Sequence, residues 1–233
     1  AGGIPAVMKR LGDHLHRDSL TVSGMRIGDI VDQAEVKNPD VIPDKEHAFH
    51  PEGGTAALFG NLAPEGAVVK QSAVAENMRK FTGPARVFDA ESDVLKAIRE
   101  KTLREGEVIV IRYEGPRGGP GMPETLAVTM GLDLAGFTNL ALITDGRFSG
   151  ATAGPCIGHV SPEAACGGPI AVIRDGDIIR IDITARTLDV DLTPEEISRR
   201  FANWKPVTKP IPPGYMRRYV NAVSSAALGA VLK

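Results

Sequence analysis

The chain has 233 residues, of which 42% are hydrophobic and 24% charged, a composition that can bury a core of substantial size. Lys and Arg total 27 against 29 Asp and Glu, so the chain offers no basic field for a phosphate backbone and we expect no nucleic-acid partner. No apolar run approaches membrane-spanning length, which predicts a protein outside the membrane, either cytoplasmic or the mature form of an organelle protein.

The first part of the chain predicts two short helices and a linker. Apolar residues are spaced as on one face of a helix at 3–11 and again at 25–36. We interpret both as trailing helices of a preceding amino-terminal domain. The Pro-rich segment 38–44 is typical of a connection between domains. The predicted division therefore leaves residues 1–43 as helices and linker and residues 44–233 as the carboxy-terminal domain.

The rest of the chain alternates short apolar runs with helical segments. Such short runs, punctuated by turn residues, are typical of β-strands. They lie at 56–59, 67–70, 85–88, 108–111, 140–143, 170–173, 177–181 and 187–190. Eight short strands indicate a barrel or a folded-over sheet. With the interleaved helices, the expected fold class is α/β, a β-barrel-like domain with flanking helices.

Helices are expected between and after these strands. They are predicted over 94–103, from 123 toward 131, over 197–204 and over 215–232. The segment 89–93 supplies a cap for the first of them, and Thr193 with Pro194 supplies one for the third. The last helix is rich in small residues and can therefore pack closely on a partner surface.

Ser149 lies in a turn of small residues that follows the apolar run 139–144. Asp145 and Gly146 end that run, and a polar side chain just past a buried strand lies at a sheet edge, where ligands commonly bind. The surrounding glycines and alanines leave space for a substrate to approach the Ser149 hydroxyl. In the alternative interpretation, Ser149 is a turn residue that caps a following helix.

Three motifs around this serine resemble the carboxy-terminal half of dihydroxy-acid dehydratases. They lie at 112–124, 144–150 and 158–165, with further similarity at 1–5, 60–66 and 80–85 and onward to about residue 200. The resemblance implies the swivelling domain also found in aconitase-like enzymes. It implies dehydration of dihydroxy acids on an iron–sulfur cluster whose ligands belong to an amino-terminal half, and a homodimer for the full-length protein. We expect this chain to be a truncated or proteolytic fragment of such an enzyme.

The resemblance also implies roles for residues of these motifs. Ser149 is expected to be the base, because metal ions and backbone N–H groups can stabilise its alkoxide. The N–H groups of Gly150 and Ala151 are expected to bind that alkoxide or the substrate carboxylate. Glu124 is expected to bind Mg²⁺ through a hard carboxylate oxygen. Its alternative role is to complement the helix dipole in the first turn of the following helix.

Two further residues are candidates for substrate binding, each with a structural alternative. Arg147 has the fork of donors that pairs with a carboxylate, but it is equally suited to an ion pair with Asp145. His159 precedes a helix that we expect to start at Ser161 or Pro162. Its default role is that of a structural histidine that holds the loop around Ser149.

Other motifs are excluded as sites. The run 118–121 is predicted to be a tight turn, because it lacks the Lys-Ser/Thr ending of a phosphate loop. The histidine pairs 14/16 and 47/50 lack further ligands and are predicted to be solvated surface. Cys156 and Cys166 provide neither a paired-thiol motif nor the four ligands of a cluster, and we expect them to pack as small residues.

The function that the resemblance implies is that of a dihydroxy-acid dehydratase of branched-chain amino-acid (valine and isoleucine) synthesis. Such an enzyme is a hydro-lyase that uses an iron–sulfur cluster and Mg²⁺. A sugar-acid dehydratase of the same family is one alternative, and a non-catalytic, stand-alone binding module is another. Because this chain cannot hold the cluster by itself, we expect it to be folded, colourless and inactive on its own.

Overall fold

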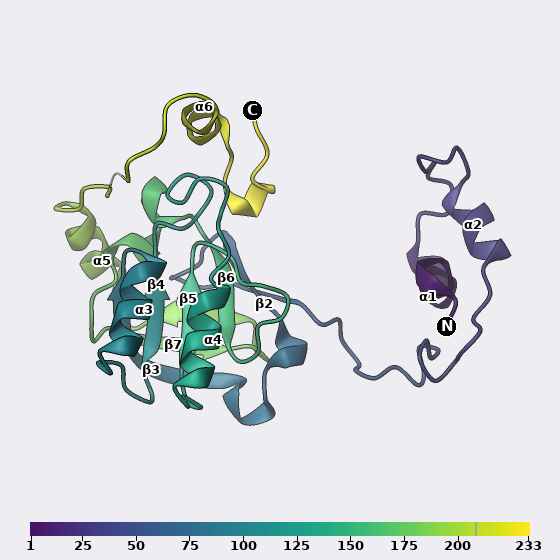
Figure 1. Ribbon diagram of the computed structural model, residues 1–233, viewed down its shortest axis with the longest axis horizontal. Helices are drawn as coiled ribbons and strands as arrows, with labels where there is room; N and C mark the ends of the chain where they lie inside the picture. Colours follow the sequence, from purple (N-terminus) through teal and green to yellow (C-terminus); the bar gives the residue numbers. More distant parts are fainter. Residues whose placement is uncertain (208) are drawn as a thin grey trace. The chain divides into compact units, whose positions relative to one another are not determined.

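The computed structural model describes residues 1–207 and 209–233, which form two compact units, Ala1–Gly53 and Gly54–Lys233 (Figure 1). The predicted boundary after residue 43 separates the end of a preceding domain from the carboxy-terminal domain. The two compact units of this chain do not test that boundary, so it stays a prediction.

The first unit contains two short helices, α1 (Gly3–Leu11) and α2 (Ile27–Gln33). Lys9 of α1 donates through Nζ to the carbonyl oxygen of Ala34 at 2.7 Å, which ties α1 to the segment after α2. The first helix matches its prediction. The second is shorter than the predicted 25–36, because the residues that flank it on both sides have extended backbone.

The second unit is built on one eight-stranded sheet with the order β1-β2-β6-β5-β4-β3-β7-β8. The strands are β1 (Ala56–Leu58), β2 (Gly66–Val69), β3 (Lys80–Phe88), β4 (Val108–Ile111), β5 (Ala141–Thr144), β6 (Cys156–Ser161), β7 (Ile178–Asp182) and β8 (Thr187–Val190). Neighbouring strands from β3 to β6 are parallel, and the other pairs are antiparallel. The predicted mixed α/β class is confirmed.

One predicted strand of this sheet is absent and one strand was not predicted. The run 170–173 is not a strand: its first three residues lie in the 3₁₀-helix η5 (Pro169–Val172), where Pro169 lacks the N–H that a strand ladder needs. Conversely, the sequence did not predict β6. It contains Gly158 and has His159 at a φ of 57°, both unfavourable in a strand, and its register with β2 shifts at this point. Pairing with β2 on one side and β5 on the other nevertheless holds it in the sheet.

Hydrogen bonds outside the strands bring the two edges of the sheet together. Phe59, directly after β1, bridges to Thr187 of β8, and the Asn61 side chain exchanges bonds of 2.7 and 2.8 Å with the backbone of β8. Gly60 fits between them only because it lacks a side chain, since a Cβ there would lie 2.1 Å from the carbonyl oxygen of Leu188. The sheet is therefore nearly closed into a barrel, which protects its edges.

Apolar cores lie on both faces of the sheet. In β4, the two valines belong to the core inside the barrel, whereas Ile109 and Ile111 belong to the core beneath the helices. This alternation is the two-residue period of a strand. The helices α3 (Glu91–Arg99) and α4 (Leu126–Leu134) lie side by side and cover the outer face of β4 and β5 (Figure 1).

Two more helices, α5 (Pro194–Phe201) and α6 (Tyr215–Ala222), follow the barrel. The Thr193 hydroxyl caps α5 as predicted, accepting a bond of 3.2 Å from the N–H three residues on. α6 is shorter than the predicted 215–232, because the chain folds back after it and Val223 bridges to Leu232. Within the described part of the chain, every helix is too short or too polar to cross a membrane.

Candidate active site

The loop that carries Ser149 connects β5 to β6. Ser149 is half-buried, and Ala151 donates its backbone N–H to Ser149 Oγ at 3.3 Å. The chain then enters β6 at Cys156, so no helix follows and Ser149 does not cap one. An alkoxide at Ser149 would therefore be stabilised by one backbone N–H, that of Ala151, and not by the N-terminus of a helix.

Ser149 lines a cavity of about 210 Å³. The other lining residues are Thr55, Val68, Lys70, Phe148, Gly150, Thr152, Gly154, Cys156, Gly158 and His159. Lys70 donates through Nζ to the carbonyl oxygen of Gly150 at 2.6 Å. Our sequence reasoning missed Lys70. The feature that could have indicated Lys70 is its position directly after β2. Because β2 and β6 are antiparallel, the end of β2 lies beside the beginning of β6, which the serine loop leads into.

His159 contributes both its backbone and its ring to this region. Its backbone N–H donates to the carbonyl oxygen of Gly146 at 2.7 Å, which fastens the beginning of the serine loop to β6. Burial, with a smaller contribution from the charge of Arg147, lowers the pKa of His159, so the half-buried ring is neutral at pH 7. β6 runs through His159 to Ser161, so the prediction of a helix starting at Ser161 or Pro162 is wrong.

Glu124 and Arg147 are joined by a parallel bridge, which brings the segment before α4 alongside the serine loop. Thr125 adds a backbone bond of 3.0 Å to the carbonyl oxygen of Arg147. Arg147 is exposed, and its Nε donates to the carbonyl oxygen of Met122 at 2.5 Å. Glu124 is also exposed. Because α4 begins at Leu126, Glu124 precedes the helix, and its predicted place in the first turn is wrong.

Asp145 is fully buried and binds backbone groups instead of Arg147. Its carboxylate accepts hydrogen bonds from the N–H groups of Tyr113, Glu114 and Ala164, at 2.8 to 3.0 Å. Burial raises the pKa of Asp145 to about 6, so the group is ionised at neutral pH. One charge thus holds together the end of β4, the start of the serine loop and the segment after β6.

Glu163 fastens the glycine-rich turn 115–121, which leads to Glu124. Its buried carboxylate accepts bonds from the N–H groups of Arg117 and Gly118, at 3.0 and 2.9 Å. Gly115 must lack a side chain here, because a Cβ would lie 2.6 Å from Glu163 Oε2. Burial raises the pKa of Glu163. The sequence did not predict that Asp145 and Glu163 organise the site, since each of these carboxylates binds backbone N–H groups of residues that are distant in sequence.

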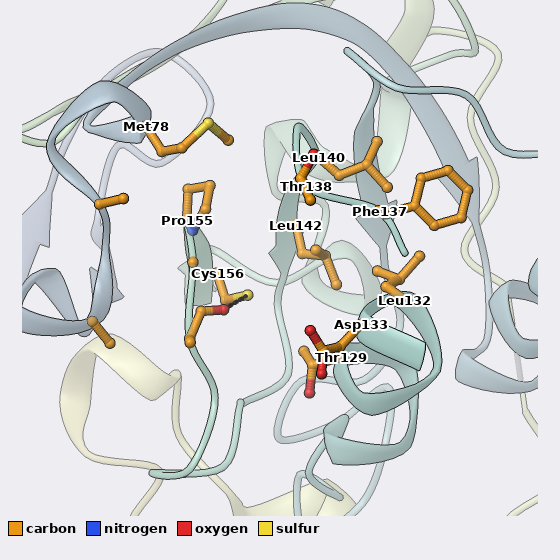
Figure 2. Close-up of a pocket in the computed structure, with 14 residues that line it drawn as sticks. Met78, Thr129, Leu132, Asp133, Phe137, Thr138, Leu140, Leu142, Pro155 and Cys156 are labelled. Atoms are coloured by element: carbon orange, nitrogen blue, oxygen red, sulfur yellow. Dashed lines mark hydrogen bonds between the residues drawn. The ribbon is translucent and has the colours of Figure 1, made fainter. Parts of the chain in front are cut away.

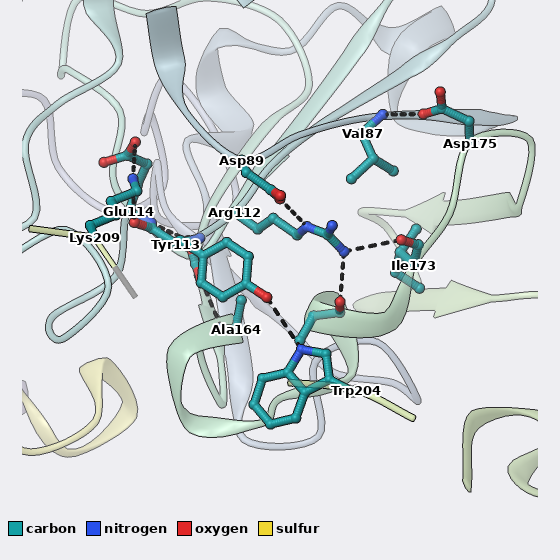
Figure 3. A network of polar contacts seen from close by, with 12 residues as sticks. Val87, Asp89, Arg112, Tyr113, Glu114, Ala164, Ile173, Asp175, Trp204 and Lys209 are labelled. Atoms are coloured by element: carbon teal, nitrogen blue, oxygen red, sulfur yellow. Dashed lines mark hydrogen bonds and ion pairs between the residues drawn. The ribbon is translucent and has the colours of Figure 1, made fainter. Parts of the chain in front are cut away.

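A polar network holds the segment after β4 from another side (Figure 3). Arg112 donates to the backbone carbonyl oxygens of Ala171 and Ile173. The Tyr113 hydroxyl accepts a bond of 3.2 Å from Trp204, which follows α5. Lys209 pairs with the carboxylate of Glu114 at 2.8 Å. These contacts fix the backbone from which the glycine-rich turn departs.

A second cavity, of about 320 Å³, lies beside α4 and β5 (Figure 2). Its lining is mainly apolar and includes Met78, Leu132, Phe137, Leu140, Leu142 and Pro155. Cys156 lines both cavities, and its Sγ donates to the carbonyl oxygen of Ala153 at 3.5 Å. Burial raises the pKa of the Cys156 thiol to about 12, so it packs as a neutral side chain.

Comparison with known proteins assigns this arrangement to a family. The family model described as "Dihydroxy-acid/6-phosphogluconate dehydratase C-terminal" matches residues 40–230. The chain belongs to this dehydratase family. The matched residues include the whole barrel with its serine loop, the glycine-rich turn and Glu124.

Several relatives match this chain along its entire length. It is 54% identical over 234 residues to a dihydroxy-acid dehydratase of Thermodesulfovibrio yellowstonii and 52% identical over 233 residues to one of Methanoregula boonei. It is 50% identical over 237 residues to dihydroxy-acid dehydratase 1 of Methanosarcina acetivorans. The chain spans 42 to 43% of the length of these relatives.

The donor groups of the chain fit one of the two cofactors implied by the resemblance. The exposed carboxylate of Glu124 suits a hard cation such as Mg²⁺. The described residues contain no group of three or more His, Cys, Asp or Glu that could hold a metal ion, so Glu124 would need ligands from outside this part of the chain. An iron–sulfur cluster does not fit, because Cys156 is a buried neutral thiol and Cys166 is the only other cysteine.

Proposed function

We propose that the chain is the carboxy-terminal part of a dihydroxy-acid dehydratase, a hydro-lyase that converts a 2,3-dihydroxy acid into a 2-oxo acid with Ser149 as the base. The observation that carries the proposal is the cavity lined by Ser149, whose Oγ already accepts the Ala151 N–H. The names of the relatives support the substrate class.

In the proposed reaction, Ser149 Oγ, as the alkoxide, takes the proton from the carbon next to the substrate carboxylate. The bond between carbon 3 and its hydroxyl group breaks, the hydroxide leaves and is protonated to water, and the enol that forms tautomerises to the 2-oxo acid. A serine hydroxyl is a weak base, so its alkoxide needs stabilisation. The Ala151 N–H supplies one donor, and the neutral ring of His159 borders the cavity without adding charge. Mg²⁺, held by Glu124 and by ligands from elsewhere in the enzyme, would supply positive charge for substrate oxygens. Arg147 is a further candidate for substrate binding, since its guanidinium is exposed.

The wider setting of this reaction is proposed from the resemblance of the motifs at 112–124, 144–150 and 158–165. The pathway is branched-chain amino-acid synthesis, in which valine and isoleucine are made. An amino-terminal half supplies the cluster ligands, the complete enzyme is a cytoplasmic homodimer, and the barrel unit corresponds to the swivelling domain of aconitase-like enzymes. These proposals predict that this chain alone is inactive.

The test uses the complete enzyme, with the proposed amino-terminal half joined to this chain. We expect turnover of 2,3-dihydroxy-isovalerate to 2-oxo-isovalerate, measured by trapping the 2-oxo acid. A long polyhydroxylated sugar acid is the comparison substrate. Preference for the sugar acid would contradict the proposed substrate, and the absence of turnover of either acid would contradict the proposed enzyme activity.

A further inference from the structure

The cavity beside Ser149 carries a single permanent charge. Lys70 is the only Lys or Arg among the described residues that line it, and the lining includes no Asp or Glu. The ring of His159 is neutral at pH 7, because burial and the nearby Arg147 lower its pKa. A ligand that enters this cavity therefore meets one positive group, which favours an anion.

Lys70 is held in place without using all of its donors. Its Nζ gives one hydrogen bond to the carbonyl oxygen of Gly150, at 2.6 Å, and an ammonium group has three donors in total. The bond fixes the ammonium beside the residue that follows Ser149. The remaining donors are available to a carboxylate, which forms stronger hydrogen bonds with a charged donor than with a neutral one.

Thr152 provides an independent indication of a ligand-binding site. It lines the same cavity, and its Oγ1 is buried without a hydrogen-bond partner among the described residues. Buried hydroxyl groups are normally paired, because an unmade hydrogen bond is costly. An oxygen atom of a ligand in the cavity would supply the missing partner.

We propose that Lys70 binds the carboxylate of the organic acid substrate in this cavity, with the Thr152 hydroxyl as a second donor. The inference rests on the proposed function, because it assumes a substrate that is a carboxylic acid. The reacting carbon is bonded directly to the carboxylate carbon, so the group that binds the carboxylate must lie close to the base. Lys70 and Ser149 meet this requirement by lining one cavity of about 210 Å³.

The experiment compares an acid with its neutral amide in the complete enzyme. Dissociation constants of 2-oxo-isovalerate and 2-oxo-isovaleramide are measured by equilibrium titration for the parent, Lys70→Gln, Lys70→Arg and Thr152→Val. Lys96→Gln is the matched control, since Lys96 is an exposed lysine of α3 outside the cavity. Ser149→Ala is assayed separately for turnover.

Lys70→Gln should weaken binding of the acid about tenfold or more, as expected for loss of a charge-assisted bond, and change binding of the amide less than twofold. Lys70→Arg should retain most of the affinity, Thr152→Val should lose part of it, and Lys96→Gln should lose none. Equal loss of acid and amide binding in Lys70→Gln would show a structural role for Lys70 and overturn the inference. Unchanged acid binding in Lys70→Gln, or undetectable acid binding by the parent, would also overturn it. If Ser149→Ala retains turnover, the proposed function fails, whatever Lys70 does.

Discussion

Replacement of Asp145 by Asn should remove a pH dependence of stability that the parent chain shows between about pH 4 and pH 6. The folded state raises the pKa of this buried carboxyl from its ordinary value of 3.8 to about 6. Between these values the folded chain binds the proton more tightly than the unfolded chain, so the free energy of unfolding falls as the pH rises. Above about pH 6 both states are ionised at this residue, and its contribution to the slope ends.

The size of the effect follows from the two pKa values. One pH unit corresponds to about 1.36 kcal/mol, so the interval from 3.8 to about 6 amounts to about 3 kcal/mol. Asp145 is fully buried, so solvent screening does not reduce this figure. Three backbone N–H groups donate to the carboxylate and offset part of the cost of burying its charge. The value of about 3 kcal/mol is the net effect after this offset.

Urea unfolding of the 233-residue chain at several pH values from 4 to 7, followed by circular dichroism, measures this effect. The quantity of interest is the free energy of unfolding of the parent minus that of Asp145→Asn, because subtraction cancels other titrating groups. This difference should fall by about 2 kcal/mol as the pH rises from 4 to 6, and the full value of about 3 kcal/mol is reached only over a wider pH range on both sides. Asp133→Asn, at an exposed position of α4, is the matched control. A difference for Asp145→Asn that does not vary with pH would refute the reasoning.

Three further predictions address the barrel, the metal and the cysteines. Gly60→Ala should lower the free energy of unfolding by at least about 2 kcal/mol, because its Cβ would lie 2.1 Å from the carbonyl oxygen of Leu188; unchanged urea unfolding would show that the barrel seam does not need glycine. Glu124→Gln should weaken Mg²⁺ activation of the complete enzyme more than substrate binding, and an unaltered Mg²⁺ dependence would remove Glu124 from the metal site. Iodoacetamide at pH 8 should label exposed Cys166 in the folded chain before buried Cys156, as read by mass spectrometry. Equal labelling would contradict the burial of Cys156.

Local sequence patterns predicted most of the sheet. The runs at 108–111 and 140–143 are short and wholly apolar because both faces of these strands are buried, and they correspond to β4 and β5. The same pattern failed at 170–173, since a 3₁₀-helix enclosed on all sides is just as apolar as a buried strand. β6 has the opposite character: its glycine and histidine are poor strand formers, and only pairing with the neighbouring strands holds it in the sheet.

The candidate site was predictable where it depends on a motif and unpredictable where it depends on topology. Ser149 and Glu124 stood out in the sequence, and the structure brings the segments that carry them together through the bridge between Glu124 and Arg147. Lys70 lies far from Ser149 in the sequence and reaches its loop only because β2 pairs with β6. Asp145 and Glu163 bind backbone N–H groups, which carry no signature in the sequence.

The central claim is that Ser149 acts as the base, and the turnover number of Ser149→Ala in the complete enzyme tests it most directly. Ser198→Ala, at an exposed position of α5, is the matched control. We predict that Ser149→Ala lowers kcat by several orders of magnitude while cluster content and folding stay at the level of the parent, because only the proton acceptor is removed. We predict full turnover for Ser198→Ala. A kcat for Ser149→Ala within about tenfold of the parent would contradict the assignment.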